Sequence, residues 1–194
     1  MNLIGTLAIA MGSGWVSGIN LYATVAVLGL AQRYHWVELP EQFRVFDHDV
    51  LIAVALALYV VEFVADKVPW VDTLWDAGHS FVRPLGGALV AIASNGHASV
   101  ATMALVGLVG AAVAAGGHAT KASARAAVNL SPEPFTNWFL SLGEDVFVVG
   151  LVVLALAHPV AALGVTLTTL VLIIALAGRI VRALRRRFAG SPLA

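Results

Sequence analysis

Four ionisable residues near the middle of the chain have the spacing of one helical face. Asp72, Asp76, His79 and Arg83 follow one another at steps of four, three and four residues, which places them on the same side of a helix. They combine carboxylates, an imidazole and a guanidinium. Such a set can bind an ion, relay protons or form structural ion pairs.

Two further groups of ionisable residues are expected at a similar depth. Glu62 and Asp66 lie four residues apart just before the central stripe. Later in the chain, His118, Lys121 and Arg125 are spaced to share one face. We therefore expect the three groups to form one acid–base cluster.

The composition indicates a membrane protein. Of the 194 residues, 60% are hydrophobic and 11% are charged, whereas soluble domains have about 45–50% apolar and about 25% charged residues. The net charge of zero provides no field to recruit nucleic acid. The absence of cysteine excludes disulfides and thiolate chemistry.

Apolar stretches predict an all-α fold with about six transmembrane helices, because each span needs roughly 20 apolar residues. The predicted spans are residues 3–32, 50–65, 81–94, 98–115, 138–157 and 160–177, and we expect Gly12, Gly14 and Gly18 to break the first of them near its start. The third is short, and it crosses a membrane only if its helix begins before Arg83 or if the segment is buried in protein. We expect a broken or re-entrant polar helix around residues 68–83.

Small and aromatic residues add detail to this picture. Ser13 and Ser17, like Gly14 and Gly18, form small-xxx-small steps in the first span, which predict a close approach by another helix. The tryptophans at positions 70 and 75 are offset from the polar stripe, as rings at a membrane boundary would be.

The loops at residues 39–43 and 131–135 share a P-E-x-F core. This similarity, with three spans in each half, predicts two inverted three-helix repeats, residues 1–97 and 98–194, within one integrated membrane domain. With both termini in the cytoplasm, only Arg33 and Arg44 of the bases remain outside, as the positive-inside rule favours.

Three segments together resemble a known family. They are residues 17–22, residues 62–84, and the run from Gly117 to Lys121 with Ser123, Arg125 and Asn129. They resemble a domain-of-unknown-function family of small bacterial integral membrane proteins with relatives in plant plastids. The resemblance implies a helical protein of the bacterial inner membrane, and it implies no established activity.

The polar residues favour a transporter or channel that moves a small ion or solute, with an anion among the options. The expected path residues are Asn20, Tyr22, Glu62, Asp66, Asp72, Asp76, His79, Arg83, His118, Lys121, Arg125 and Asn129. One alternative is a lipid-handling protein in which the bases grip a phosphate head group. Another is a membrane scaffold in which the charges only pair.

Catalytic and cofactor motifs do not occur in the sequence. There is no G-x-S-x-G elbow, phosphate loop, dinucleotide motif or paired-histidine metal pattern. We therefore expect no enzyme activity, no cofactor and no dedicated metal site. The expected partners are the lipid bilayer and further copies of the chain, with no nucleic acid.

Overall fold

The computed structural model describes residues 3–37, 41–96, 99–129 and 134–189, and these residues form helices joined by short connections. The order is α1 (Leu3–Ile19), α2 (Leu21–Arg33), the 3₁₀ helix η1 (Glu41–Phe46), α3 (Asp49–Ala65), α4 (Pro69–Asn95), α5 (Val100–Asn129), α6 (Pro134–Ala157) and α7 (Pro159–Ala189). The all-α prediction is confirmed for the described residues.

The segment predicted as the first span, residues 3–32, is divided at Asn20, and the predicted break at Gly12, Gly14 and Gly18 is wrong because α1 is continuous through these glycines. Asn20 has extended backbone angles (φ −145°, ψ 97°), and its side chain accepts a hydrogen bond from the Ala23 backbone N–H. Asparagine is a favoured N-cap because its side-chain oxygen satisfies a free N–H of the first turn. Asn20 therefore ends α1 and starts α2.

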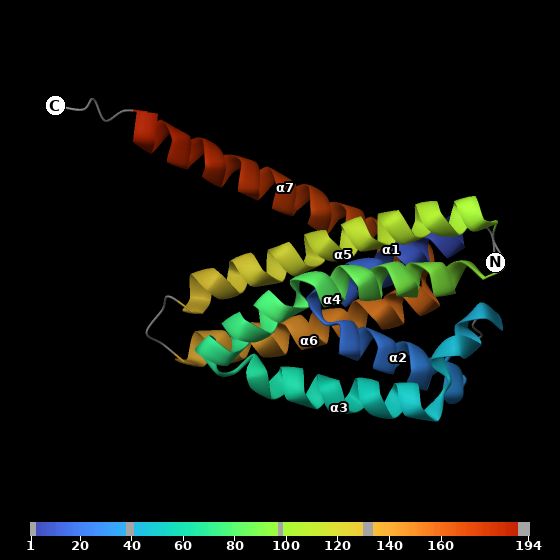
Figure 1. Ribbon diagram of the computed structural model, residues 1–194. Helices are drawn as coiled ribbons and strands as arrows, with labels where there is room; N and C mark the ends of the chain where they lie inside the picture. The colour runs from blue at the N-terminus through green and yellow to red at the C-terminus, as the bar shows by residue number, and fades with distance from the viewer. Residues whose placement is uncertain (1–2, 38–40, 97–98, 130–133, 190–194) are drawn as a thin grey trace.

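The break changes the path of the chain. In Figure 1, α1 runs into the bundle and α2 returns towards the end from which α1 came. The start of α1 and the end of α7 consequently lie at opposite ends of the molecule. The prediction that both termini share one side depended on a single first span, which the structure does not contain.

Helix α4 is continuous, so the predicted break around residues 68–83 is also wrong. Pro69 occupies the first turn, where its missing N–H costs nothing, and Pro84 lies inside the helix. The helix begins at Pro69, well before Arg83, as the predicted third span required, and a membrane crossing by α4 stays a prediction. Its first half carries the polar stripe and its second half is apolar.

The remaining predicted spans correspond to observed helices. Spans 50–65, 138–157 and 160–177 lie in α3, α6 and α7, and α5 extends without a break from its apolar half into its basic half. Residues 38–40 and 130–133 lie outside the described part of the chain, so the P-E-x-F loops cannot be compared there. The inverted repeat stays a prediction. The first helical segments of the two halves differ, because the first half begins with the two helices α1 and α2, whereas the second half begins with the single helix α5.

Helix α1 occupies the centre and contacts α2, α4, α5, α6 and α7. A Cβ at Gly18 would collide with the backbone of Ala114 on α5, and one at Gly87 on α4 would collide with the Ala114 side chain. The small residues therefore bring α1, α4 and α5 together. This confirms the close approach predicted from the small-xxx-small steps.

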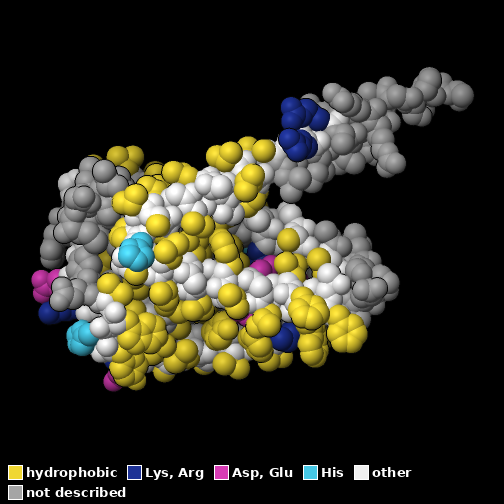
Figure 2. All heavy atoms as spheres, turned by 180° about the vertical axis from the view of Figure 1, so that it is seen from behind, with side chains coloured by type: hydrophobic (Ala, Val, Ile, Leu, Met, Phe, Trp, Pro, Cys, Tyr) yellow, Lys and Arg dark blue, Asp and Glu magenta, His cyan; other side chains and the backbone are white. Residues whose placement is uncertain are grey.

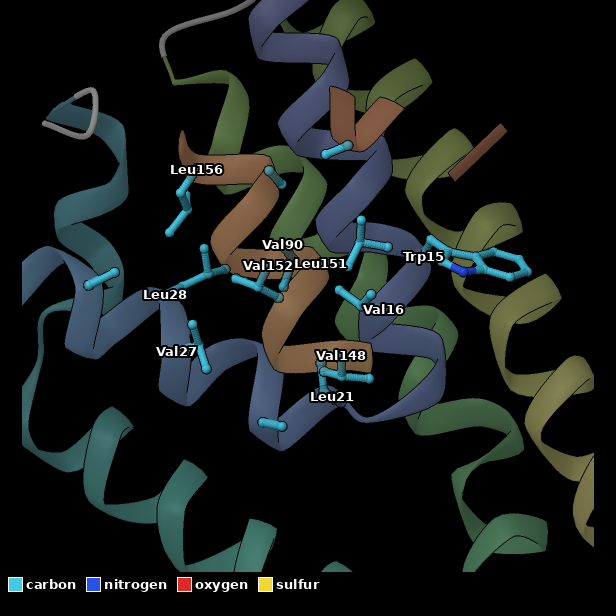
Figure 3. Close-up of a cluster of buried hydrophobic side chains, with 14 of the residues drawn as sticks. Trp15, Val16, Leu21, Val27, Leu28, Val90, Val148, Leu151, Val152 and Leu156 are labelled. Carbon is cyan, nitrogen blue, oxygen red and sulfur yellow. The ribbon is translucent and has the colours of Figure 1, made fainter. Parts of the chain in front are cut away.

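An apolar core fills the space between α1, α2, α4 and α6 (Figure 3). Val148 and Val152 of α6 belong to this core, and in this view Val152 lies between Val16 of α1 and Leu28 of α2. Trp15 is buried on the other side of α1, where its ring lies 3.4 Å from a Cβ placed at Gly116 of α5. This core packs α1 and α2 against α6.

The surface is largely apolar. Figure 2 shows one face covered mainly by hydrophobic side chains, and the exposed large apolar residues lie on α3, α4, α5, α6 and α7. Two helices, Val100–Ala126 and Phe135–Ala157, are long and apolar enough to cross a membrane. An apolar outside around a charged inside indicates association with a membrane.

Candidate functional site

Charged side chains from four helices meet inside one end of the bundle. They come from the end of α3, the first half of α4, the second half of α5 and the start of α6. We call this set the acid–base cluster: Glu62, Asp66, Asp72, Asp76, Arg83, His118, Lys121, Arg125 and Glu144. The first eight are buried, and the Glu144 side chain is 13% exposed.

Arg83 connects α4 to α3. Its Nη2 donates to Glu62 Oε1 at 2.8 Å, and its Nη1 lies 3.0 Å from Asp76 Oδ1. Arg83 and Glu62 are both fully buried. The central stripe therefore faces the end of α3, as the one-face spacing predicted.

Lys121 binds two carboxylates of α3 at once. Its Nζ lies 2.9 Å from Glu62 Oε1 and 2.9 Å from Asp66 Oδ2. Glu62 and Asp66 are one helical turn apart, so a single ammonium can bridge them. Glu62 Oε1 consequently accepts from both Lys121 and Arg83.

Arg125 joins α5 to α3 and α6. Its Nη2 lies 3.0 Å from Asp66 Oδ2 and 2.7 Å from Glu144 Oε2. Its Nη1 donates to the side-chain oxygen of Asn137 at 2.8 Å and to the Asp66 carbonyl at 2.9 Å. This fork of donors ties three helices to one guanidinium.

His79 lies beside the cluster and contacts α2. Its Nδ1 is 2.7 Å from the Trp75 carbonyl, and its Nε2 is 2.8 Å from the Tyr22 hydroxyl. A carbonyl only accepts, so Nδ1 carries the proton and the neutral ring accepts from Tyr22 at Nε2. The Trp75 and His79 rings are stacked with centroids 4.5 Å apart.

His118 has the opposite tautomer. Arg83 Nη1 donates to His118 Nδ1 at 2.8 Å, since a guanidinium has no acceptor. The Nε2 of the neutral ring therefore donates to the Ser80 hydroxyl, 3.1 Å away. The Ser80 hydroxyl in turn donates to the Asp76 carbonyl at 3.2 Å.

The helix break lies against α6. The Asn20 side-chain oxygen caps α2, so its amide nitrogen is directed elsewhere and donates to Asp145 Oδ1 at 3.2 Å. Asp145 is buried. The tip of the α1–α2 pair is therefore hydrogen-bonded to Asp145, which directly follows the cluster residue Glu144 in the sequence.

The structure places eleven of the predicted path residues in or beside the cluster. Those outside the cluster are Asn20 and Tyr22, at the start of α2, and His79 of α4. The side chain of Asn129 lies outside the described residues. Trp75 is stacked on His79, whereas Trp70 is 69% exposed, and the placement of these two rings at a membrane boundary stays a prediction.

The prediction missed Asn137, Glu144 and Asp145 on α6. Glu144 and Asp145 are ionisable residues inside an apolar segment, a signal that points to buried polar chemistry. Lys67 lies nearby, in the turn after α3, where it donates to the Phe63 carbonyl at 2.8 Å. Burial lowers the pKa of this lysine.

A polar cavity of ≈ 220 Å³ lies between α4 and α5. Asp72, Asp76, His118 and Arg125 supply its charged and ring groups, and the exposed residues Thr73 and Ser80 lie at its rim. Because a water occupies about 30 Å³, the space admits several waters or a small solute. The cavity provides access from the surface to the cluster.

The arrangement can hold charge and move protons. Acids and bases of the cluster lie within hydrogen-bond distance of one another, and His118 contacts Arg83 and Ser80, so the kinds of group that a proton relay uses are present. The described residues bring together no group of three His, Cys, Asp or Glu side chains suited to a metal ion.

Comparison with known proteins identifies a family. Residues 7–179 match the family model described as domain of unknown function (DUF4126). No curated protein and no solved structure matches the chain.

Proposed function

Since the chain belongs to this domain-of-unknown-function family, we propose its function from the geometry of the site: it is a membrane transporter that moves a small ion or solute past the acid–base cluster. The polar cavity between α4 and α5 is its entrance on one side. The neighbouring helix break supplies the movable element.

The observation that carries this proposal is the position of the break at Asn20. Many transporters bind their substrates where a discontinuous helix leaves free backbone ends near the middle of the membrane. Here the start of α2 contacts the buried polar site twice, through Asn20 to Asp145 and through Tyr22 to His79. A displacement of this tip would alter both contacts together.

The lipid-handling alternative has less support. Arg83, Lys121 and Arg125 are buried and each already contacts carboxylates, so a phosphate head group would have to displace these acids. The scaffold alternative is supported by the same pairing. It accounts less well for a polar cavity that reaches the paired groups.

We place α3 to α7 across the bilayer and the α1–α2 pair as a re-entrant element. The end of the bundle that contains Lys67, Arg125 and the C-terminal half of α7 then faces the cytoplasm, because it holds most of the bases. Arg33 and Arg44 lie at the other end with the start of α1. The N-terminus is therefore proposed to be outside and the C-terminus inside.

Flux from proteoliposomes tests the proposal. Purified protein is reconstituted and screened with protons, alkali cations, halides and phosphate. We expect flux of one of these, reduced at least about tenfold in Asp76→Asn, because Asp76 lines the cavity and contacts Arg83; a tenfold change corresponds to about 1.4 kcal/mol.

Glu41→Gln is the matched control, since the Glu41 side chain is 82% exposed in η1. It removes one carboxylate at the end of the bundle away from the cluster and should leave flux unchanged. The absence of any flux from folded protein, or equal flux in both variants, would contradict the proposed path.

A further inference from the structure

Acids outnumber bases inside the charged end. Six carboxylates lie in or beside the cluster and only three bases are buried with them. The carboxylates are Glu62, Asp66, Asp72, Asp76, Glu144 and Asp145, and the bases are Arg83, Lys121 and Arg125. An excess of ionised carboxylates in a low-dielectric interior is costly, so the site favours binding of positive charge.

The carboxylates differ in how well they are compensated. Glu62 has one oxygen without a hydrogen-bond partner, but its Oε1 accepts from two bases, Arg83 and Lys121. These two cations compensate the charge of the Glu62 carboxylate through charge-assisted hydrogen bonds.

Asp145 has the opposite surroundings. No ion pair among the described residues includes it, and its contact at Oδ1 is the neutral amide of Asn20. Its Oδ2 is buried and has no hydrogen-bond partner in the described part of the chain. An ionised carboxylate with a bare buried oxygen is disfavoured, and a proton on Oδ2 removes that cost.

The charged and titratable groups around Asp145 are mainly acidic. Glu62, Asp66 and Tyr59 of α3 act on it electrostatically, together with Lys67 after α3 and Lys121 of α5. Lys121 is already bound to Glu62 and Asp66. Lys67 donates to the Phe63 carbonyl and lies 3.5 Å from the hydroxyl of Ser141, one turn before Asp145 on α6.

We propose that Asp145 is a proton-binding site and that the proton is the ion transported or coupled in this protein. The proposal rests on the proposed transport function. A proton from the aqueous phase forms an O–H bond at Oδ2, and Oδ1 keeps its contact with Asn20. Release of the proton returns a carboxylate, whose bond to Asn20 is charge-assisted and shorter.

This chemistry couples proton binding to the helix break. Asn20 caps α2, so the N-terminal end of that helix, with its partial positive charge, faces Asp145. The ionised carboxylate attracts this end and holds the α1–α2 tip on α6. The protonated form attracts it less, so the tip is freer to move when the site is loaded.

Infrared difference spectroscopy on full-length protein in lipid nanodiscs tests the proton site without requiring transport. Wild-type protein should show the C=O band of a protonated carboxyl that disappears as the pH is raised. Asp145→Asn should lack this band, and Asp145→Glu should restore a titrating band at a shifted position. Asp47→Asn, which alters a carboxylate paired with Arg33 on the surface, is the matched control and should keep the wild-type band.

Flux measured on the same variants separates the two proposals. Proton-dependent flux that Asp145→Asn abolishes supports both. The Asp145 band without flux of any solute would support the proton site and contradict the transport function. Flux that is insensitive to pH, or a titrating band unchanged in Asp145→Asn and in Asp145→Glu, would overturn the proton site alone.

Discussion

The two ends of the bundle are held together by different forces. At one end, α1, α4 and α5 meet through glycine and alanine, and α6 adds the apolar side chains Val148 and Val152. At the other end, Arg83 of α4 and Lys121 of α5 meet the carboxylates at the end of α3, and Arg125 of α5 joins this end of α3 to Glu144 of α6. Helices α4, α5 and α6 thus each have one apolar half and one charged half.

Only the apolar end is explained by its contribution to stability. Close packing of small residues brings helix backbones together without exposing polar groups to lipid. Buried ion pairs, by contrast, require desolvation that often exceeds their attraction, and apolar residues of similar size are commonly as stable or more stable. Stability therefore does not explain why the buried charged residues are present, and we expect them to serve the function of the protein.

The largest effect is expected from removing one member of the charged end. Arg125→Met leaves Glu144 and part of Asp66 without their guanidinium partner, and stranding a buried charge costs about 3–5 kcal/mol. Chemical unfolding in detergent micelles measures this loss. Arg33→Met removes a half-exposed pair with Asp47 and should cost about 0–1 kcal/mol; equal losses in the two variants would remove the distinction between buried and surface pairs.

The apolar end should respond to a single methyl group. The Cβ of Gly18→Ala would collide with the Ala114 backbone of α5, so the helices must separate, at a cost of about 1–3 kcal/mol. Thermal unfolding of the reconstituted protein measures the change. Gly150→Ala is the control because no atom lies within 4 Å of its added Cβ, and a wild-type melting curve for Gly18→Ala would disprove the close contact.

The smallest effect is expected where the two ends meet. Tyr22→Phe removes the hydroxyl that donates to His79 Nε2 at 2.8 Å, which lowers the free energy of unfolding by about 0.5–1.5 kcal/mol. Tyr34→Phe, at a position 64% exposed, should leave it unchanged. Chemical unfolding curves of the two variants measure this difference. Indistinguishable curves would show that the hydrogen bond between Tyr22 and His79 does not contribute to the free energy of unfolding.

The sequence predicted the charged end better than the helix break. The steps between Asp72, Asp76, His79 and Arg83 follow helical periodicity, and this local rule placed them correctly. The glycines predicted a break near residues 12–18, whereas the break lies at Asn20 and depends on an N-cap within an apolar segment, which hydropathy does not reveal. Asp145 was missed because its contact with Asn20 joins residues 125 positions apart.

One measurement tests most directly whether the charged end serves function and not stability. The double variant Glu62→Leu with Lys121→Met removes a contacting pair of opposite charge, and it leaves Arg83 with Asp76 and Arg125 with Asp66. We predict that its free energy of unfolding is unchanged or raised by about 1–4 kcal/mol while its flux in proteoliposomes is lost. Wild-type flux, or a protein that no longer folds, would contradict this account.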